Sequence, residues 1–187
     1  LVRRFCVGRF YRSSLISMLA LFNLFLDICL LRKGPQDVPA SMALTKLCLL
    51  AYGLSSLLVL LTEVPAPVAL LQVLLDMVLL GGLLYLGLIL HRHPKRFEQT
   101  LTALTGTGSL MGLLALPLAI WIDHQQPGGD IALPSTLMFV LMVWSIAVIA
   151  HILRHAFDIS IWLGVVYSLS YTFLYWTLAG WIGPQTP

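Results

Sequence analysis

The stretch that decides the fold is residues 14–33, "SLISMLALFNLFLDICLLRK". It is apolar for long enough to cross a hydrocarbon core of about 30 Å, which takes about 20 helical residues. It nevertheless contains Asn23 and Asp27 and has basic residues near both ends. Whether this stretch crosses the membrane decides on which side every later loop lies.

Composition assigns the whole chain to the membrane. Of its 187 residues, 59% are hydrophobic and 10% are charged, and the mean hydropathy is +0.92. A soluble domain typically has about 25% charged residues. Five further apolar runs are long enough to span a bilayer, at residues 43–62, 67–90, 100–122, 134–153 and 159–182. The sequence predicts an all-α polytopic bundle of five transmembrane helices, preceded by an amphipathic or re-entrant N-terminal helix.

The positions of Lys and Arg separate two topologies. If residues 14–31 cross as a sixth span, the chain has four basic residues on one side and seven on the other, against the positive-inside rule. If they enter and leave on the same side, all eleven fall on one face. The second topology is favoured, and a sixth span is the alternative. The favoured topology predicts a multi-pass protein of the bacterial inner membrane with a cytoplasmic N-terminus and the loop "DHQQPGGD" in the periplasm.

The helical geometry of the opening stretch agrees with the charge count. At about 100° per residue, its polar side chains fall within about a third of the helix circumference. They are Ser13, Ser17, Asn23 and Asp27. Such a helix can lie along the headgroup boundary or pack its polar stripe against the bundle. The chain is therefore divided into a basic N-terminal segment, residues 1–40, and a five-span bundle, residues 41–187.

Two later segments carry a resemblance to a known family. "RFEQTLTALTGTGSLMGLLALP" (96–117) opens the third span, and "VWSIAVIAHILRHAFDISIWLGVV" (143–166) joins the last two. Together with the basic N-terminal segment and five close-packed spans, they resemble bacterial members of the Yip (Ypt-interacting protein) membrane family. The resemblance implies a non-enzymatic protein of adaptor type. Eukaryotic relatives bind small GTPases through a cytoplasmic N-terminal region, which is too short here to be comparable.

One acid lies well inside a predicted span. Asp76 stands in "QVLLDMVLL" (72–80), one turn after Gln72 and on the same helix face. A carboxylate at such a depth costs a few kcal/mol, so it is expected to face the bundle and to be protonated or paired. One hypothesis is a proton or cation pathway, to which Asp27 would add a second acid. The alternative is a neutral acid hydrogen-bonded across helices by hydroxyls of similar depth, namely Ser55, Ser56, Ser145, Tyr171, Thr172 and Tyr175.

Four histidines fall on the predicted cytoplasmic side. His91 and His93 follow the second span, and His151 and His155 are one helical turn apart. A zinc or haem site would need such spacing, but no carboxylate or cysteine accompanies these histidines at ligand spacing. We therefore interpret this weak histidine cluster as interface residues, and predict no metal and no cofactor.

The glycine-rich segment "TGTGSLMG" (105–112) is not a phosphate loop. It lacks the lysine and the preceding strand that such a loop requires. Gly108 and Gly112 are instead four residues apart, a spacing that lets neighbouring membrane helices approach closely. The segment is predicted to be a packing face.

Two function classes follow from these observations. The first is a membrane adaptor or organiser, favoured by the short loops and by the absence of a convergent nucleophile, base and orienting group, which argues against an enzyme. The second is a small transporter or channel subunit that uses Asp76, favoured by Gln72 and by a kink expected near Pro117. The expected partners are the lipid bilayer, other membrane proteins or further copies of the chain. Nucleic acid is excluded because no basic stripe is interleaved with aromatic residues.

Overall fold

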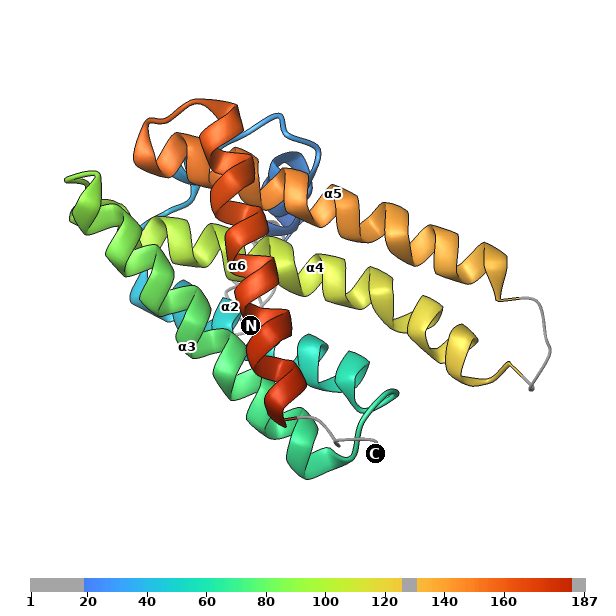
Figure 1. Cartoon of the computed structure of the whole chain (residues 1–187). Coiled ribbons are helices and arrows are strands. Elements are labelled where there is room, and N and C mark those ends of the chain that lie inside the picture. Colours follow the sequence, from blue (N-terminus) through green and yellow to red (C-terminus); the bar gives the residue numbers. More distant parts are fainter. Residues whose placement is uncertain (1–18, 126–130, 183–187) are drawn as a thin grey trace, which may run out of the picture.

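Five long helices form the protein in the computed structural model, which describes residues 19–125 and 131–182. They are α2 (Met42–Leu60), α3 (Ala66–Leu90), α4 (Phe97–Asp123), α5 (Ala132–Phe157) and α6 (Ile161–Ile182) (Figure 1). Each is long and apolar enough to cross a membrane, and the described ranges contain no strand. The predicted all-α class with five spans is confirmed, and the chain is a multi-pass membrane protein.

The helix ends differ from the predicted spans by a few residues. The largest difference is in α5, which continues to Phe157 rather than ending at residue 153. It ends there because Asp158 adopts a left-handed backbone conformation, with φ 54°, and its N–H donates to the carbonyl oxygen of Arg154. The segment "HILRH" is thus the end of a helix. Pro117 lies inside α4, which continues as a helix to Asp123.

Basic residues gather at one end of the bundle, which we call the basic end. There α2, α4 and α6 begin and α3 and α5 end. All seven described Lys and Arg residues lie in these helix termini or in the adjoining turns, namely Arg32, Lys33, Lys46, Arg92, Lys95, Arg96 and Arg154. The opposite, acidic end carries Glu63 and Asp123. This separation agrees with the predicted grouping of charge. Which end faces the cytoplasm stays a prediction.

The N-terminal helix, Leu19–Cys29, packs one face on the bundle. Phe25, Ile28 and Cys29 are buried. Asn23 lies on the exposed side, together with Leu19, Phe22 and Leu26. The idea that the polar stripe packs against the bundle is therefore wrong for this described part. The reason is steric, because the Phe25 ring fills the space over Gly106, where a Cβ atom would come within 2.3 Å of it.

Contacts of this helix place it well below the basic end. Gly106, which Phe25 covers, lies about 14 Å along α4 from Phe97 at about 1.5 Å per residue. The Trp144 indole Nε1 donates to the carbonyl oxygen of Cys29 at 2.9 Å. This depth fits a half-inserted helix better than one lying in the headgroup boundary. Residues 14–18, with the polar Ser17, lie outside the described residues, so whether the stretch crosses stays a prediction.

The central helix α4 packs against α2 on one side and α5 on the other. Its first half is lined by buried hydroxyl residues, each of which donates to a carbonyl three or four residues earlier; they are Thr100, Thr102, Thr105, Thr107 and Ser109. A Cβ atom on Gly108 would lie 2.6 Å from the Tyr52 ring, and one on Gly112 would lie 2.9 Å from Ser55 Oγ. The predicted glycine packing face is confirmed, and it holds Tyr52 of α2 in place.

Candidate functional site

The candidate site is built around Asp76, in the middle of α3. Its side chain is buried, with the residue 7% exposed. The Tyr52 hydroxyl donates to Oδ2 and the Tyr171 hydroxyl donates to Oδ1, so that α2, α3 and α6 meet at one carboxyl group. Asp76 lies about 15 Å along α3 from Ala66 at about 1.5 Å per residue. The acid is thus near the middle of the bundle.

The sequence of α6 explains how Tyr171 reaches Asp76. Tyr167, Tyr171 and Tyr175 recur every four residues and therefore share one face of the helix. The same side of α6 packs closely on α5, since a Cβ atom on Gly164 would lie 2.5 Å from the carbonyl oxygen of Ala150 and Ser168 Oγ donates to the carbonyl oxygen of Ile146. The inner face of α6 therefore meets both α5 and α3, and its tyrosines reach Asp76 on α3.

Gln72 forms a second polar link between α3 and α6. Its residue is 7% exposed, and its Nε2 donates to the carbonyl oxygen of Ala179 at 3.2 Å. It lies one helical turn from Asp76 toward the acidic end. The two polar residues that the sequence paired on one face of α3 are therefore both directed into the bundle, where each binds α6.

An open cleft of about 350 Å³, which we call the Asp76 cavity, adjoins the Asp76 carboxyl group on the side of the acidic end. All five long helices contribute to its lining. The polar side chains in the lining are Tyr52, Ser56, Asp76, Ser145, Tyr171, Thr172 and Tyr175. The remainder is apolar, with three methionines, Met111, Met138 and Met142, and the indole of Trp176. An acid in the middle of the membrane therefore faces a space large enough for a small molecule.

No positive side chain compensates the charge of Asp76. Among the described residues that line the cavity there is no Lys, Arg or His. The two tyrosine hydroxyls stabilise a carboxylate by hydrogen bonding but cannot neutralise it. An unpaired charge in a low-dielectric interior is strongly unfavourable. The carboxyl group therefore has to hold either a proton or a cation that enters the cavity.

A second space, an apolar groove on the side of the basic end, is also bordered by Tyr171. This groove has a volume of about 300 Å³ and runs between α3 and α6, past Leu84 and Gly87 to Phe157 and Tyr167. At its end the Tyr167 hydroxyl and His91 Nε2 are 3.2 Å apart. Tyr171 thus stands between a cavity on the acidic side and a groove on the basic side.

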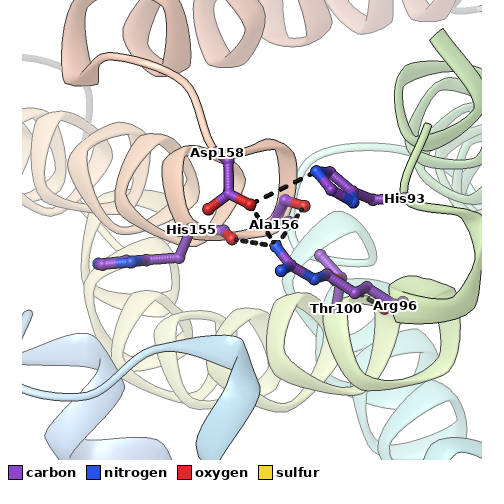
Figure 2. Close-up of polar contacts among 6 residues, drawn as sticks. All are labelled: His93, Arg96, Thr100, His155, Ala156 and Asp158. Carbon is purple, nitrogen blue, oxygen red and sulfur yellow. Dashed lines mark hydrogen bonds and ion pairs between the residues drawn. The ribbon is translucent and has the colours of Figure 1, made fainter. Parts of the chain in front are cut away.

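At the basic end, Arg96 ties α4 to the end of α5 (Figure 2). Its Nη1 donates to the carbonyl oxygens of His155, at 3.1 Å, and Ala156, at 3.3 Å. It also lies 3.1 Å from Asp158 Oδ2, an oxygen that His93 Nε2 approaches at 3.4 Å. A cation at the last carbonyls of a helix stabilises its C-terminus. This cluster is satisfied within the chain and fastens the turn between α5 and α6.

The four predicted histidines do not converge on one point. His91 stacks on Phe157, with ring centroids 5.2 Å apart, whereas His93 approaches Asp158. His151 and His155 form a separate pair with centroids 4.7 Å apart, and His151 Nε2 lies 3.2 Å from the carbonyl oxygen of Lys33. Within residues 19–125 and 131–182, no three His, Cys, Asp or Glu side chains are placed to hold a metal ion.

Asp27, the third acid named from the sequence, lies away from this site. Its carboxylate pairs with Lys33 Nζ at 2.8 Å, at the end of the N-terminal helix. It does not line the cavity that contains Asp76. The structure therefore gives Asp76 no second acid from this helix.

Tyr52 is the site residue that the sequence analysis missed. Five of the hydroxyl residues that were expected at the depth of Asp76 do line the cavity, namely Ser56, Ser145, Tyr171, Thr172 and Tyr175. Tyr52 precedes Ser56 by one turn and lies on the same face of α2, so its depth and position also indicated it. The contact from α2 to Asp76 is made by the long side chain of Tyr52 and not by the serines of α2, Ser55 and Ser56.

Comparison with known proteins adds no relative to this description. No family model, no curated protein and no solved structure matches the chain. The resemblance to the Yip family therefore stays a prediction.

Proposed function

We propose that the protein is a small membrane transporter whose binding site is the cavity around Asp76. One observation carries this proposal, which is that a buried acid without a positive partner faces a cavity of about 350 Å³. A purely structural acid needs hydrogen-bond partners but no adjoining space. A binding site needs both the space and a few placed polar groups.

The two spaces on either side of Tyr171 support transport rather than binding alone. A carrier has to expose one site alternately to the two sides of the membrane. Here the cavity extends toward the acidic end and the groove extends toward the basic end, and Tyr171 borders both. We also propose, from the positive-inside rule, that the basic end faces the cytoplasm of a bacterial inner membrane.

The second candidate is the adaptor of Yip type. The observation in its favour is the shortness of the connections, with three residues, 158–160, between α5 and α6 and five, 61–65, between α2 and α3. Such loops leave little room for a folded domain on either side. An adaptor does not require a hydrated cavity or an ionisable Asp76.

Thiol labelling tests whether the cavity contains water. In a background with the native cysteines replaced, Thr172→Cys should react with a water-soluble methanethiosulfonate, because Thr172 lines the cavity. Phe173→Cys is the matched control at the same depth, since Phe173 is 76% exposed on the outer, lipid-facing side. Equal failure of both variants to react would contradict a water-accessible site.

Transport itself is tested by solute uptake into proteoliposomes that contain the reconstituted full-length protein, with a proton gradient across the membrane. A panel of labelled organic cations, organic anions, neutral solutes and metal ions should include at least one class that gives an uptake signal. Asp76→Asn should abolish this signal, whereas Asp27→Asn, which removes an acid outside the cavity, should retain it. If no class gives an Asp76-dependent signal, the transporter proposal fails and the adaptor is favoured.

A further inference from the structure

The charge of the Asp76 cavity restricts the charge of its ligand. Asp76 is the one carboxylic acid among the described lining residues, and no base accompanies it. The other ionisable groups facing it are the hydroxyls of Tyr52, from α2, and of Tyr171 and Tyr175, from α6. The lining residues of α4 and α5 include no ionisable group. The ionised site thus carries one uncompensated negative charge, which attracts a monovalent cation and rejects anions.

The chemistry of the lining separates organic cations from metal ions. A hard metal ion takes about six oxygen ligands, which in proteins come largely from carboxylates, carbonyls and water. Most of this lining is hydrocarbon, thioether and aromatic surface, including Met111, Met142 and Trp176. Two of its hydroxyls already donate to backbone carbonyls, Ser145 to Met142 at 2.8 Å and Thr172 to Ser168 at 2.9 Å. Aromatic faces and methionine side chains instead suit an organic cation.

The volume of the cavity points the same way. Small-molecule pockets span about 300 to 1,000 Å³, and the Asp76 cavity has about 350 Å³. This space is much larger than a metal ion held directly by protein oxygens. It fits a compact organic molecule with one ring and a small charged head.

We infer that the Asp76 cavity binds a hydrophobic organic monovalent cation, an aromatic amine or quaternary ammonium, in exchange for a proton. The inference rests on the proposed transport function and names its substrate class. When the cation enters, the Asp76 carboxylic acid releases its proton to water and the carboxylate pairs with the cation. The charge of the site is neutral before and after. One proton therefore leaves for each cation bound.

Calorimetry of the full-length protein in detergent tests this inference directly. The probe is phenyltrimethylammonium, and the control is benzenesulfonate, which has the same ring and a tetrahedral head of opposite charge. The first should bind and the second should not. Titrations in two buffers with different ionisation enthalpies should give one proton released per cation. Lowering the pH should weaken binding, because protons compete for the same carboxylate.

Variants assign this behaviour to the cavity. Asp76→Asn should weaken binding by about tenfold or more, because it removes a buried charge partner, and should abolish proton release. Asp27→Asn should change neither quantity. Tyr175→Leu, within the lining, should weaken binding several-fold, whereas Tyr85→Leu, on the outer face of α3, should not.

The possible results distinguish the substrate class from transport. Binding without proton release, equal binding by a folded Asp76→Asn variant, or equal binding of benzenesulfonate would overturn the inference. If Asp76→Asn does not fold, the two-buffer titration of the unaltered protein and the Tyr175→Leu variant decide. Asp76-dependent uptake of anions, neutral solutes or metal ions, but not of organic cations, would support a transporter and refute the inferred substrate class. No Asp76-dependent uptake of any class would refute both.

Discussion

Replacing Asp76 tests how much the buried acid contributes to the bundle. In Asp76→Leu, the hydroxyls of Tyr52 and Tyr171 both lose their acceptor. Interhelical hydrogen bonds in membrane proteins contribute about 0.6 kcal/mol each on average, with a maximum of about 1.7. Two such bonds give an expected loss of about 1.2 kcal/mol in the free energy of unfolding. Asp76→Asn keeps the shape of the side chain and one acceptor oxygen, and its NH₂ group can donate to the second tyrosine hydroxyl, so its loss should stay below about 0.5 kcal/mol.

The assay is reversible unfolding by SDS in mixed micelles, followed by tryptophan fluorescence. Tyr52→Phe and Tyr171→Phe are each made alone and together with Asp76→Leu. The cycles should give a coupling energy of about 0.6 kcal/mol between Asp76 and each tyrosine. Tyr85→Phe is the control, because Tyr85 is 53% exposed and makes a ring contact with Phe97; its effect should be close to zero.

Two results would refute this reasoning. The first is an Asp76→Leu variant at least as stable as the unaltered protein. It would mean that the free-energy cost of burying the acid is at least as large as the stabilisation from its hydrogen bonds. The second is full additivity of the tyrosine and Asp76 substitutions, which would mean that the contacts contribute nothing in the membrane.

Four further predictions concern the rest of the fold. Reporter fusions after residues 33 and 95 should read cytoplasmic and one after residue 63 periplasmic, since the first two lie at the basic end; opposite sides for 33 and 95 would exclude both topologies. Phe10→Cys and Lys33→Cys should be labelled from the same side by an impermeant thiol reagent, and labelling from opposite sides would show that the first helix crosses. Gly108→Ala should lower unfolding stability by about 1–3 kcal/mol, because its Cβ meets the Tyr52 ring, whereas Gly82→Ala, with open space around it, should be neutral or stabilising. Purified protein should contain no stoichiometric zinc, copper or haem by elemental analysis and absorption spectroscopy, and a metal lost on changing His151 and His155 together would contradict this.

The spans and the grouping of charge could be read from the sequence because both are local properties. A run of about 20 apolar residues matches the thickness of the bilayer whatever its neighbours are. Basic residues mark loops without reference to packing. The predicted helix ends were wrong where a special backbone conformation ends the helix. At Asp158 a left-handed conformation ends α5, four residues after the end of the predicted apolar run.

The glycine face was also predictable, because small residues at a spacing of four mark helix contacts in lipid. The burial of Asp76 followed from the cost of exposing an acid to hydrocarbon. Its partners were predicted only in part. Depth along a span can be counted from the sequence, and it correctly indicated Tyr171, but it gives no rotation of one helix against another.

The tertiary structure alone decided which helix faces meet. Tyr52 and Tyr171 are 24 and 95 residues away from Asp76 in the chain, and both bond to its carboxyl group. In water, an apolar stripe tells which side of a helix is buried. In lipid the outside is as apolar as the inside, so hydropathy leaves the rotation of each helix open. Here it is set by steric fit, Tyr52 against Gly108 and Gly164 against Ala150, and that fit creates the cavity beside Asp76.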